Sequence, residues 1–264
     1  MMIKEAIAKL ADRRDLTRTE AFESMNDIMS GETPESHISA FLMGLRAKGE
    51  TIEEITGCAL AMRDHAVKIS TKRENVIDTC GTGGDGSGTF NISTTAALIA
   101  CAGGASVAKH GNRAVSSSCG SADLLSALGV NLEISAQKTA NVLDEVGITF
   151  LYAPMMHGAM KYAATVRKQL GLRTVFNILG PLTNPAGAKR QVLGVFRPEL
   201  TETLASVLSA MKSHHALVVH GDGGLDELSV LGKTRISELK GGTVSTFDPA
   251  GREVGASRNP CHKK

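Results

Sequence analysis

The 264-residue chain is long enough to bury a large core, in one large domain or two small ones. Hydrophobic residues make up 42% of it, which excludes an intrinsically disordered protein. The net charge of +2 and the scarcity of aromatic residues (no Trp, 2 Tyr, 7 Phe) argue against nucleic-acid binding and against attachment to an anionic membrane.

The 5 cysteines are widely spaced and include no C-x-x-C pair. This pattern favours reduced thiols over a disulfide framework. The first residues are charged throughout, unlike a signal peptide, and no apolar run approaches the length of a membrane span. We therefore expect a cytoplasmic protein that neither spans nor binds a membrane.

The first part of the chain is predicted to be entirely helical. Thr17-x-x-Glu20 and Thr51-x-x-Glu54 are capping boxes, which mark helix starts, and each is followed by apolar residues at helical spacing. Four short helices without a strand predict a small all-helical domain over residues 1–70, with a face suited to dimerisation.

From residue 76 onward, strands and helices alternate in the pattern. Strands are predicted near 76–77 and over 106–109, 148–152, 191–196 and 216–220, helices over 121–128, 135–146, 160–170 and 200–211, and a hairpin around Gly241-Gly242. Alternating units of this kind predict a mostly parallel sheet with helices on its faces and ligands at the carboxyl ends of its strands. The predicted fold class is thus α/β, with a small helical domain followed by a larger α/β domain over residues 71–264.

A glycine-rich segment lies between the first predicted strand and the next helix. Glycine permits positive φ and a close approach of ligand to backbone. Asn91, Ser93 and Thr94 follow at the helix start, where free N–H groups attract anions. The combination predicts a phosphate cradle, with a flexible surface turn as the alternative. It lacks the Gly-Lys-Ser/Thr ending of a P-loop, and its match to G-x-G-x-x-G is weak by itself. The glycines are Gly81, Gly83, Gly84, Gly86 and Gly88.

Two further segments follow predicted strand ends. Residues 109–118 include Lys109, His110, Arg113 and three serines, which offer many donors for an anion, although a solvated basic turn is the alternative. Asp226 and Glu227 follow the strand at 216–220 and fit a Mg²⁺ ion that bridges a diphosphate, or else form an ordinary acidic loop.

One arginine is a candidate for carboxylate recognition. Arg167 lies on the helix predicted over 160–170, close to other basic residues. An arginine fork binds a carboxylate through two parallel hydrogen bonds. The pattern alone favours a solvated basic helix face.

These motifs together resemble the anthranilate phosphoribosyltransferase family of tryptophan biosynthesis. The resemblance runs from the N-terminal helices to about residue 249. It rests on Gly81-Thr82-Gly83-Gly84-Asp85, Asn91-Ile92-Ser93-Thr94, Lys109-His110-Gly111-Asn112-Arg113, Val166-Arg167-x-x-Leu170-Gly171, Asn177-x-Leu179-Gly180-Pro181-Leu182-Thr183-Asn184-Pro185 and Asp226-Glu227.

The resemblance implies a homodimer formed through the helical part, hinges between the domains, Mg²⁺, and the two substrates phosphoribosyl pyrophosphate (PRPP) and anthranilate. Because an aromatic amine is already nucleophilic when neutral, we expect no obligatory catalytic base, and the site residues bind and position. Those matching metal positions are Ser93, Asp226 and Glu227; those matching anthranilate contacts are Gly81, Asn112 and Arg167. Those matching PRPP contacts are Gly81, Gly84, Asp85, Thr89, Asn91, Ile92, Ser93, Thr94, Lys109, Gly111, Asn112, Ser116, Ser117 and Ser121.

The sequence departs from the family pattern in two places. Met156-His157-Gly158-Ala159 replaces the usual Met-His-Pro-Ala, which loosens a turn beside the expected anthranilate channel. The family continues past the hairpin with several helices, whereas residues 251–264 show no helical period. We therefore expect a shortened C-terminus, an incomplete α/β domain and exposed sheet surface.

Two alternatives stay open: an enzyme like a pyrimidine nucleoside phosphorylase, and a non-catalytic relative that binds nucleic acid.

Overall fold

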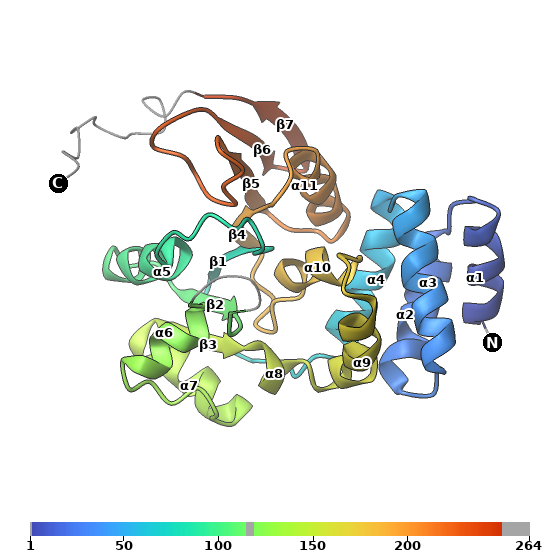
Figure 1. Ribbon diagram of the computed structural model, residues 1–264. Coiled ribbons are helices and arrows are strands. Elements are labelled where there is room, and N and C mark those ends of the chain that lie inside the picture. The colour runs from blue at the N-terminus through green and yellow to red at the C-terminus, as the bar shows by residue number, and fades with distance from the viewer. Residues whose placement is uncertain (1, 115–118, 250–264) are drawn as a thin grey trace.

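A four-helix bundle forms one side of the molecule, at the right of Figure 1. The computed structural model describes residues 2–114 and 119–249. The bundle consists of α1 (Met2–Ala11), α2 (Arg18–Ser30), α3 (Glu35–Lys48) and α4 (Ile52–His65). It contains no strand among its described residues, as the sequence predicted.

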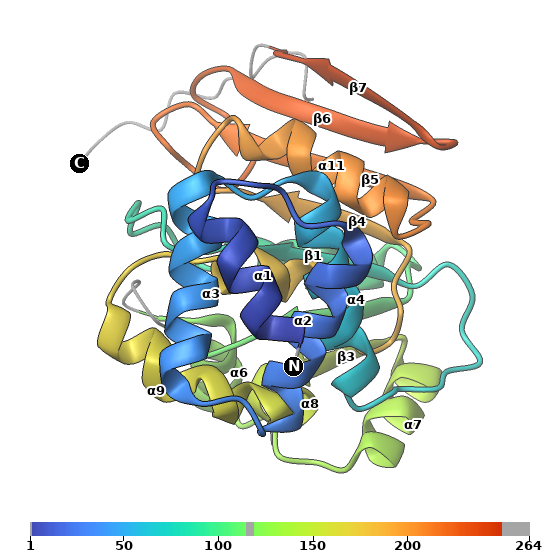
Figure 2. The same ribbon diagram turned by 90° about the vertical axis from the view of Figure 1, so that its right-hand side faces the viewer.

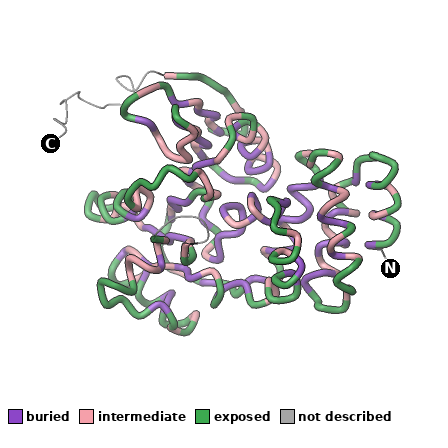
Figure 3. Tube along the Cα trace, in the orientation of Figure 1, coloured by how far each residue is buried: buried purple, intermediate pink, exposed green. Residues whose placement is uncertain are grey.

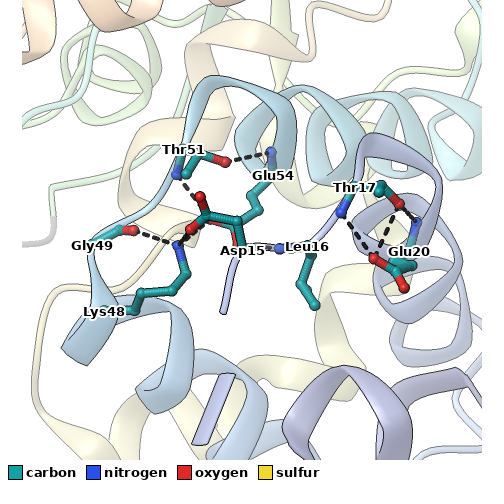
Figure 4. Close-up of polar contacts among 8 residues, drawn as sticks. All are labelled: Asp15, Leu16, Thr17, Glu20, Lys48, Gly49, Thr51 and Glu54. Carbon is teal, nitrogen blue, oxygen red and sulfur yellow. Dashed lines mark hydrogen bonds and ion pairs between the residues drawn. The ribbon is translucent and has the colours of Figure 1, made fainter. Parts of the chain in front are cut away.

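Both predicted capping boxes are present in the bundle (Figure 4). The Thr17 N–H donates to Glu20 at 2.9 Å, and the Thr51 N–H donates to Glu54 at 2.8 Å. Glu54 is fully buried and also accepts the Leu16 N–H at 2.9 Å. Its carboxylate therefore caps α4 and holds the chain between α1 and α2 at the same time.

A seven-stranded sheet forms the centre of the rest of the chain, in the order β3-β2-β1-β4-β5-β6-β7. Neighbouring strands from β3 to β5 are parallel, and β6 is antiparallel to both β5 and β7. The mostly parallel sheet and the terminal hairpin are thus confirmed. The strands are β1 (Ile77–Gly81), β2 (Val107–Gly111), β3 (Ile148–Tyr152), β4 (Arg190–Gly194), β5 (His215–Gly221), β6 (Thr234–Lys240) and β7 (Thr243–Phe247).

Helices pack on both faces of the sheet, and the bundle lies beyond the helices of one face (Figures 1 and 2). α11 packs against β5, β6 and α4, while α9 packs against α3 and α2. No described helix is long and apolar enough to cross a bilayer. The helices outside the bundle are α5 (Ile92–Ala102), α6 (Ser121–Ala127), α7 (Ala136–Val146), α8 (Ala153–Met156), η1 (Gly158–Met160), α9 (Lys161–Leu170), α10 (Phe176–Leu179), η2 (Gly180–Leu182) and α11 (Leu200–Ala210).

One hydrophobic core runs from the bundle into the sheet, and Figure 3 shows buried chain on both sides of that junction. Met25 and Phe41 of the bundle belong to the same cluster as Leu179 and Leu204 of the α/β part, and all four are fully buried. A separate, smaller cluster underlies β2, β3 and α7. The bundle is therefore packed onto the α/β part through apolar contact.

Two surfaces of the α/β part are less covered. β7 leaves four of its five residues exposed, including Phe247. On α5, Leu98 and Ile99 are 48% and 67% exposed. The exposed residues of β7 agree with the expectation of exposed sheet surface. The exposed apolar side chains of α5 form a second such surface, on a helix.

Candidate active site

The site lies where the strand order of the sheet reverses, between β1 and β4. β2 and β3 follow β1 on one side, whereas β4 and β5 lie on the other. In open parallel sheets such a reversal leaves a crevice at the carboxyl ends of the two strands. Gly81 ends β1 and pairs with Gly194, which ends β4. The loop after β5 fills the space above this pair.

Both of these glycines make room for Asp226. A Cβ on Gly81 would lie 2.7 Å from the Asp226 Oδ2, and one on Gly194 would lie 1.5 Å from the Asp226 carbonyl oxygen. No side chain fits at either position unless the loop that carries Asp226 moves. The Gly83 N–H then donates to the Asp226 Oδ2 at 2.9 Å. Residues separated by more than 140 positions are thereby joined in one site.

The glycine loop has a conformation that requires its glycines. Gly83, Gly84, Gly86 and Gly88 all have φ between +64° and +79°. L-residues with a side chain rarely adopt this region. Thr89 is exposed, with its hydroxyl 3.2 Å from the Ser87 hydroxyl. The loop is therefore an open, backbone-lined surface, as a phosphate cradle requires.

α5 begins directly after this loop, with Asn91 as its N-cap residue. The Asn91 side chain makes no capping hydrogen bond; its amide lies 3.6 Å from the Cys119 Sγ instead. Ile92, Ser93 and Thr94 form the first turn, and the buried Thr94 hydroxyl has no hydrogen-bond partner among the described residues. The first-turn N–H groups, without a side-chain cap, remain suited to an anionic ligand.

Lys109 lies beneath the cradle and not in a solvated turn. It is on β2 and only 3% exposed. Its Nζ donates to the Thr79 carbonyl oxygen and, at 3.0 Å, to the Ser93 Oγ. Burial lowers the pKa of Lys109, while Asp78 opposes that shift. The ammonium group therefore brings positive charge to the first turn of α5 from inside the protein.

Asp78 supports this arrangement from within the sheet. Its carboxylate is fully buried and accepts the His110 N–H at 3.0 Å and the Asn184 amide at 2.8 Å. Burial raises the pKa of Asp78, and the nearby Lys109 opposes the increase. The carboxylate thus joins β1, β2 and the segment after η2 behind the site.

The carboxylates of Asp85, Asp226 and Glu227 lie close enough to shift one another's pKa. Burial first, and then the charge of Asp85, raises the pKa of Asp226 to about 6. Burial and the charge of Asp226 raise the pKa of Glu227 to about 7, although Lys109 opposes this. The Asp85 Oδ2 is buried, and no described group donates a hydrogen bond to it. An acceptor in that position, beside other carboxylates, is suited to a cation.

Two basic residues, one at the end of β2 and one after it, contact other parts of the protein. The His110 ring is buried and lies between the Gly180 carbonyl oxygen and His157. Arg113 donates to Asp123 at 3.0 Å and to the Tyr152 hydroxyl at 3.1 Å. Both side chains therefore already have protein partners, and their role as anion donors stays a prediction.

Other predicted PRPP residues of this segment stay close to the site edge. Gly111 ends β2, and a Cβ there would lie 2.4 Å from the Ser121 Oγ. The Asn112 carbonyl oxygen accepts the Ala122 N–H and, at 3.4 Å, the Ser121 hydroxyl, which fixes the start of α6. Ser116 and Ser117 lie outside the described residues.

Arg167 lies on the helix that packs against the bundle. It lies on α9, and its guanidinium is 5.2 Å from the centre of the Phe176 ring. Burial lowers the pKa of the Arg167 guanidinium. The solvated helix face that the pattern favoured is therefore not what the structure shows. A partly buried arginine stacked on an aromatic ring is well suited to an aromatic carboxylate.

Several residues of the site escaped the sequence analysis. Gly194 had a detectable signal, since a glycine inside a predicted strand often marks a close approach of backbone. Asn184 is part of a family motif, but its pairing with Asp78 gave no local signal, because it joins segments 106 residues apart. Arg173 likewise contacts the glycine loop across 89 residues.

A cavity of about 380 Å³ lies away from this site, at the amino ends of β1 and β4. Arg73, Lys189, Arg190 and His214 are among its lining residues. None of the predicted site residues lines it. In the described part of the chain, no group of three or more His, Cys, Asp and Glu residues can hold a metal ion by itself.

Comparison with known proteins agrees with the geometry. Residues 4–66 match the family described as "Glycosyl transferase family, helical bundle domain", and residues 73–263 match "Glycosyl transferase family, a/b domain". The anthranilate phosphoribosyltransferase of Symbiobacterium thermophilum is 51% identical over 258 residues, which cover 98% of this chain and 76% of that protein.

Solved structures of the same kind superimpose well. The crystal structure of anthranilate phosphoribosyltransferase from Thermus thermophilus has a TM-score of 0.89 and 45% identity, covering 97% of this chain and 76% of that one. The Saccharomyces cerevisiae enzyme, in complex with PRPP and Mg, has a TM-score of 0.83 and 29% identity, covering 94% and 72%. Another structure of the yeast enzyme is in complex with 4-fluoroanthranilate.

Proposed function

Because the chain belongs to the anthranilate phosphoribosyltransferases, we propose that it transfers the phosphoribosyl group of PRPP to the amine of anthranilate. The products are phosphoribosylanthranilate and pyrophosphate, and the reaction is a step of tryptophan biosynthesis. The observation that carries this proposal is the meeting of the glycine loop with Asp226 above the Gly81–Gly194 pair. A backbone cradle and a carboxylate loop at one crevice are what a metal-bound diphosphate needs.

The residues at the crevice fit magnesium. Mg²⁺ is usually held by one or two carboxylates and completes its ligand set with water and substrate phosphates. Asp226 and Glu227 supply the carboxylates, and their raised pKa values reflect burial and like charge. The Ser93 Oγ accepts from Lys109 and retains a lone pair for a further ligand. When bound, Mg²⁺ would neutralise charge that develops on the leaving pyrophosphate.

We infer that the protein mainly positions the substrates and neutralises charge. The glycine-loop and α5 N–H groups bind the diphosphate, and Lys109 adds positive charge from below. The anthranilate nitrogen forms the new bond to ribose C1, the bond from C1 to the pyrophosphate oxygen breaks, and the nitrogen then releases one proton to water. A neutral aromatic amine is already nucleophilic, so no protein base is required for the attack. Alignment of two bound substrates alone can lower a barrier by ~7–11 kcal/mol in model systems.

The remaining site residues are assigned by the substrate or ion that each would contact. Anthranilate contacts are assigned to Gly81, Asn112 and Arg167, with the Arg167 guanidinium binding the carboxylate. Ser93, Asp226 and Glu227 are assigned to the metal. The PRPP contacts are assigned to Gly81, Gly84, Asp85, Thr89, Asn91, Ile92, Ser93, Thr94, Lys109, Gly111, Asn112, Ser116, Ser117 and Ser121.

Two further properties are part of the proposal. We propose a homodimer formed through the bundle, which size-exclusion chromatography with light scattering would test. We also propose a cytoplasmic location, which is supported by the four described cysteines, all of them free thiols: Cys58, Cys80, Cys101 and Cys119.

A fluorescence assay tests the proposed reaction directly. Anthranilate fluorescence is followed with purified protein, PRPP and Mg²⁺, and we expect anthranilate to be consumed only when both are present. The matched control is the Asp226→Asn/Glu227→Gln variant, whose rate should fall at least tenfold and respond weakly to Mg²⁺. A parallel arm offers thymidine or uridine with phosphate. Phosphorolysis there without anthranilate consumption would favour a nucleoside phosphorylase and overturn the proposal.

A further inference from the structure

Arg173 connects the glycine loop to a distant part of the chain. It lies between α9 and α10, and its Nη2 donates a hydrogen bond to the Gly84 carbonyl oxygen. Its Cζ also lies 4.1 Å from the centre of the ring of Phe196, which is two residues beyond the end of β4. The Phe196 N–H donates to the Thr82 hydroxyl at 3.2 Å. The guanidinium is thus fixed by stacking while it bonds to the loop.

Few contacts hold this loop in place. Apart from local bonds within residues 83–92, only Asp226 and Arg173 hydrogen-bond to residues 83–90 in the parts of the chain that the structure describes. Residues 86–90 are all exposed. A loop with several positive-φ glycines has much conformational freedom to lose when it binds a ligand. Asp226 and Arg173 therefore determine how much of this conformational freedom is already lost before a ligand binds.

The bond to Gly84 also sets the direction of a donor. In a planar trans peptide, the carbonyl of one residue and the N–H of the next point in opposite directions. With the Gly84 carbonyl turned toward Arg173, the Asp85 N–H points to the other side of the peptide. No group among the described residues accepts a hydrogen bond from that N–H. It remains available to an anion in the cradle.

We propose that Arg173 is a positioning residue that orients the Gly84–Asp85 peptide for the diphosphate of PRPP. The inference rests on the proposed function. It also connects two parts of the fold, because α9 packs against the bundle and the glycine loop follows β1. Arg173 acts through the backbone, so its loss affects PRPP far more than anthranilate.

The first test needs neither substrate nor activity. Backbone ¹⁵N relaxation of the ligand-free protein reports motion at Gly83, Gly84 and Asp85. In Arg173→Ala, the heteronuclear NOE of these amides should fall, while that of the α5 amides stays unchanged. Arg197→Ala is the matched control. Arg197 is exposed and lies 5.8 Å from the same Phe196 ring, and no described group accepts a hydrogen bond from its side chain.

The second test measures ligand affinity. Calorimetric titration with pyrophosphate and Mg²⁺ should show affinity about 10- to 100-fold weaker in Arg173→Ala, the loss expected for one hydrogen bond from a charged donor. The KM for PRPP should rise to a similar extent and the KM for anthranilate little. Arg173→Lys, which keeps one donor but cannot stack as a plane, should recover part of the affinity.

The outcomes separate this inference from the proposed reaction. Equal effects of Arg173→Ala and Arg197→Ala would show a general charge effect and overturn the positioning role. Unchanged relaxation at Gly84 and Asp85 would overturn it as well. If Arg173→Ala does not fold, Arg173→Lys must still show a NOE decrease at these amides. If the protein lacks transferase activity but the NOE at Gly84 still falls in Arg173→Ala, the proposed function alone is overturned.

Discussion

The imidazole rings of His110 and His157 hydrogen-bond to each other through their Nε2 atoms, which lie 3.2 Å apart in the interior of the protein. The Nδ1 of His110 lies 3.2 Å from the Gly180 carbonyl oxygen, which can only accept. His110 must therefore carry its proton on Nδ1 and offer a lone pair at Nε2. It follows that His157 carries its proton on Nε2.

This pair makes a testable prediction for NMR. Burial, and then the charge of His157, lowers the pKa of His110 to about 3, and burial lowers the pKa of His157 to about 4. Imidazole ¹⁵N spectra should show opposite tautomers for the two rings and no titration between pH 5 and 8. Because both pKa values fall below the unfolded value, the stability they contribute is complete above about pH 6.5. It is lost as the pH falls toward 4 and 3. A midpoint near 6.5 for either ring would contradict the assignment.

Removing the buried Asp78 carboxylate should strongly destabilise the protein. The His110 N–H and one N–H of the Asn184 amide, whose other N–H donates to the Ala108 carbonyl oxygen, would be left buried without an acceptor. We expect Asp78→Ala to lower the free energy of unfolding by about 2–5 kcal/mol. Asp64→Ala, at an exposed position on α4, is the control and should change it by less than about 0.5 kcal/mol. Urea denaturation compares the two, and equal midpoints would contradict a structural role for Asp78.

The acidic pair predicts an unusual dependence of stability on pH. Asp226 and Glu227 have pKa values of about 6 and about 7, above the ordinary values of 3.8 and 4.5. Their contribution to stability is therefore complete below about pH 4 and is lost as the pH rises through 6 and 7. The melting temperature of the metal-free protein should fall over this range relative to Asp226→Asn/Glu227→Gln.

Magnesium should reverse that loss. A divalent cation replaces the protons on the carboxylates, so its stabilising effect should be large at pH 8 and small at pH 5. Thermal melting with and without Mg²⁺ at both pH values measures this. The double variant, which keeps the shape of both side chains without their charge, should not respond. An equal Mg²⁺ response in the wild type and the variant would exclude these residues as ligands.

Arg167→Ala should separate the two substrates. We expect the KM for anthranilate to rise about 10- to 100-fold, since the carboxylate would lose a charged donor. The KM for PRPP should change little. Lys168→Ala removes a neighbouring charge from an exposed position on the same helix and serves as the control. Steady-state kinetics decide the matter: an unchanged KM for anthranilate in Arg167→Ala removes this residue from the site.

Local features of the fold were predictable from the sequence. Both capping boxes form as their spacing indicates, and the strand predicted over 148–152 is Ile148–Tyr152. These features depend on residues within a few positions of one another, where propensity and side-chain spacing act directly. The prediction of a mostly parallel sheet succeeded for the same reason, since alternating strands and helices leave few other arrangements.

Relationships between distant segments were not predictable in the same way. The pattern placed Asp226 and the glycine loop at one sheet edge, but only the strand order shows that Gly194 lies beneath both. The environment of Arg167 was misjudged because the ring that covers it, Phe176, comes from another element. The partners of His110 were not predictable either, since they come from segments 47 and 70 residues away.

The shared core between bundle and sheet restricts how the molecule can close over its substrates. Swinging the bundle away as a rigid unit would separate α4 from α11, and α2 and α3 from α9, and each apolar side chain exposed in this way costs about 1.5–3 kcal/mol. The segments around β2, β3 and α7 instead have a small core of their own. Closure over the substrates should therefore move the part of the α/β domain around β2, β3 and α7, together with the glycine loop. The bundle, α9, α11 and β5 should stay in place relative to one another.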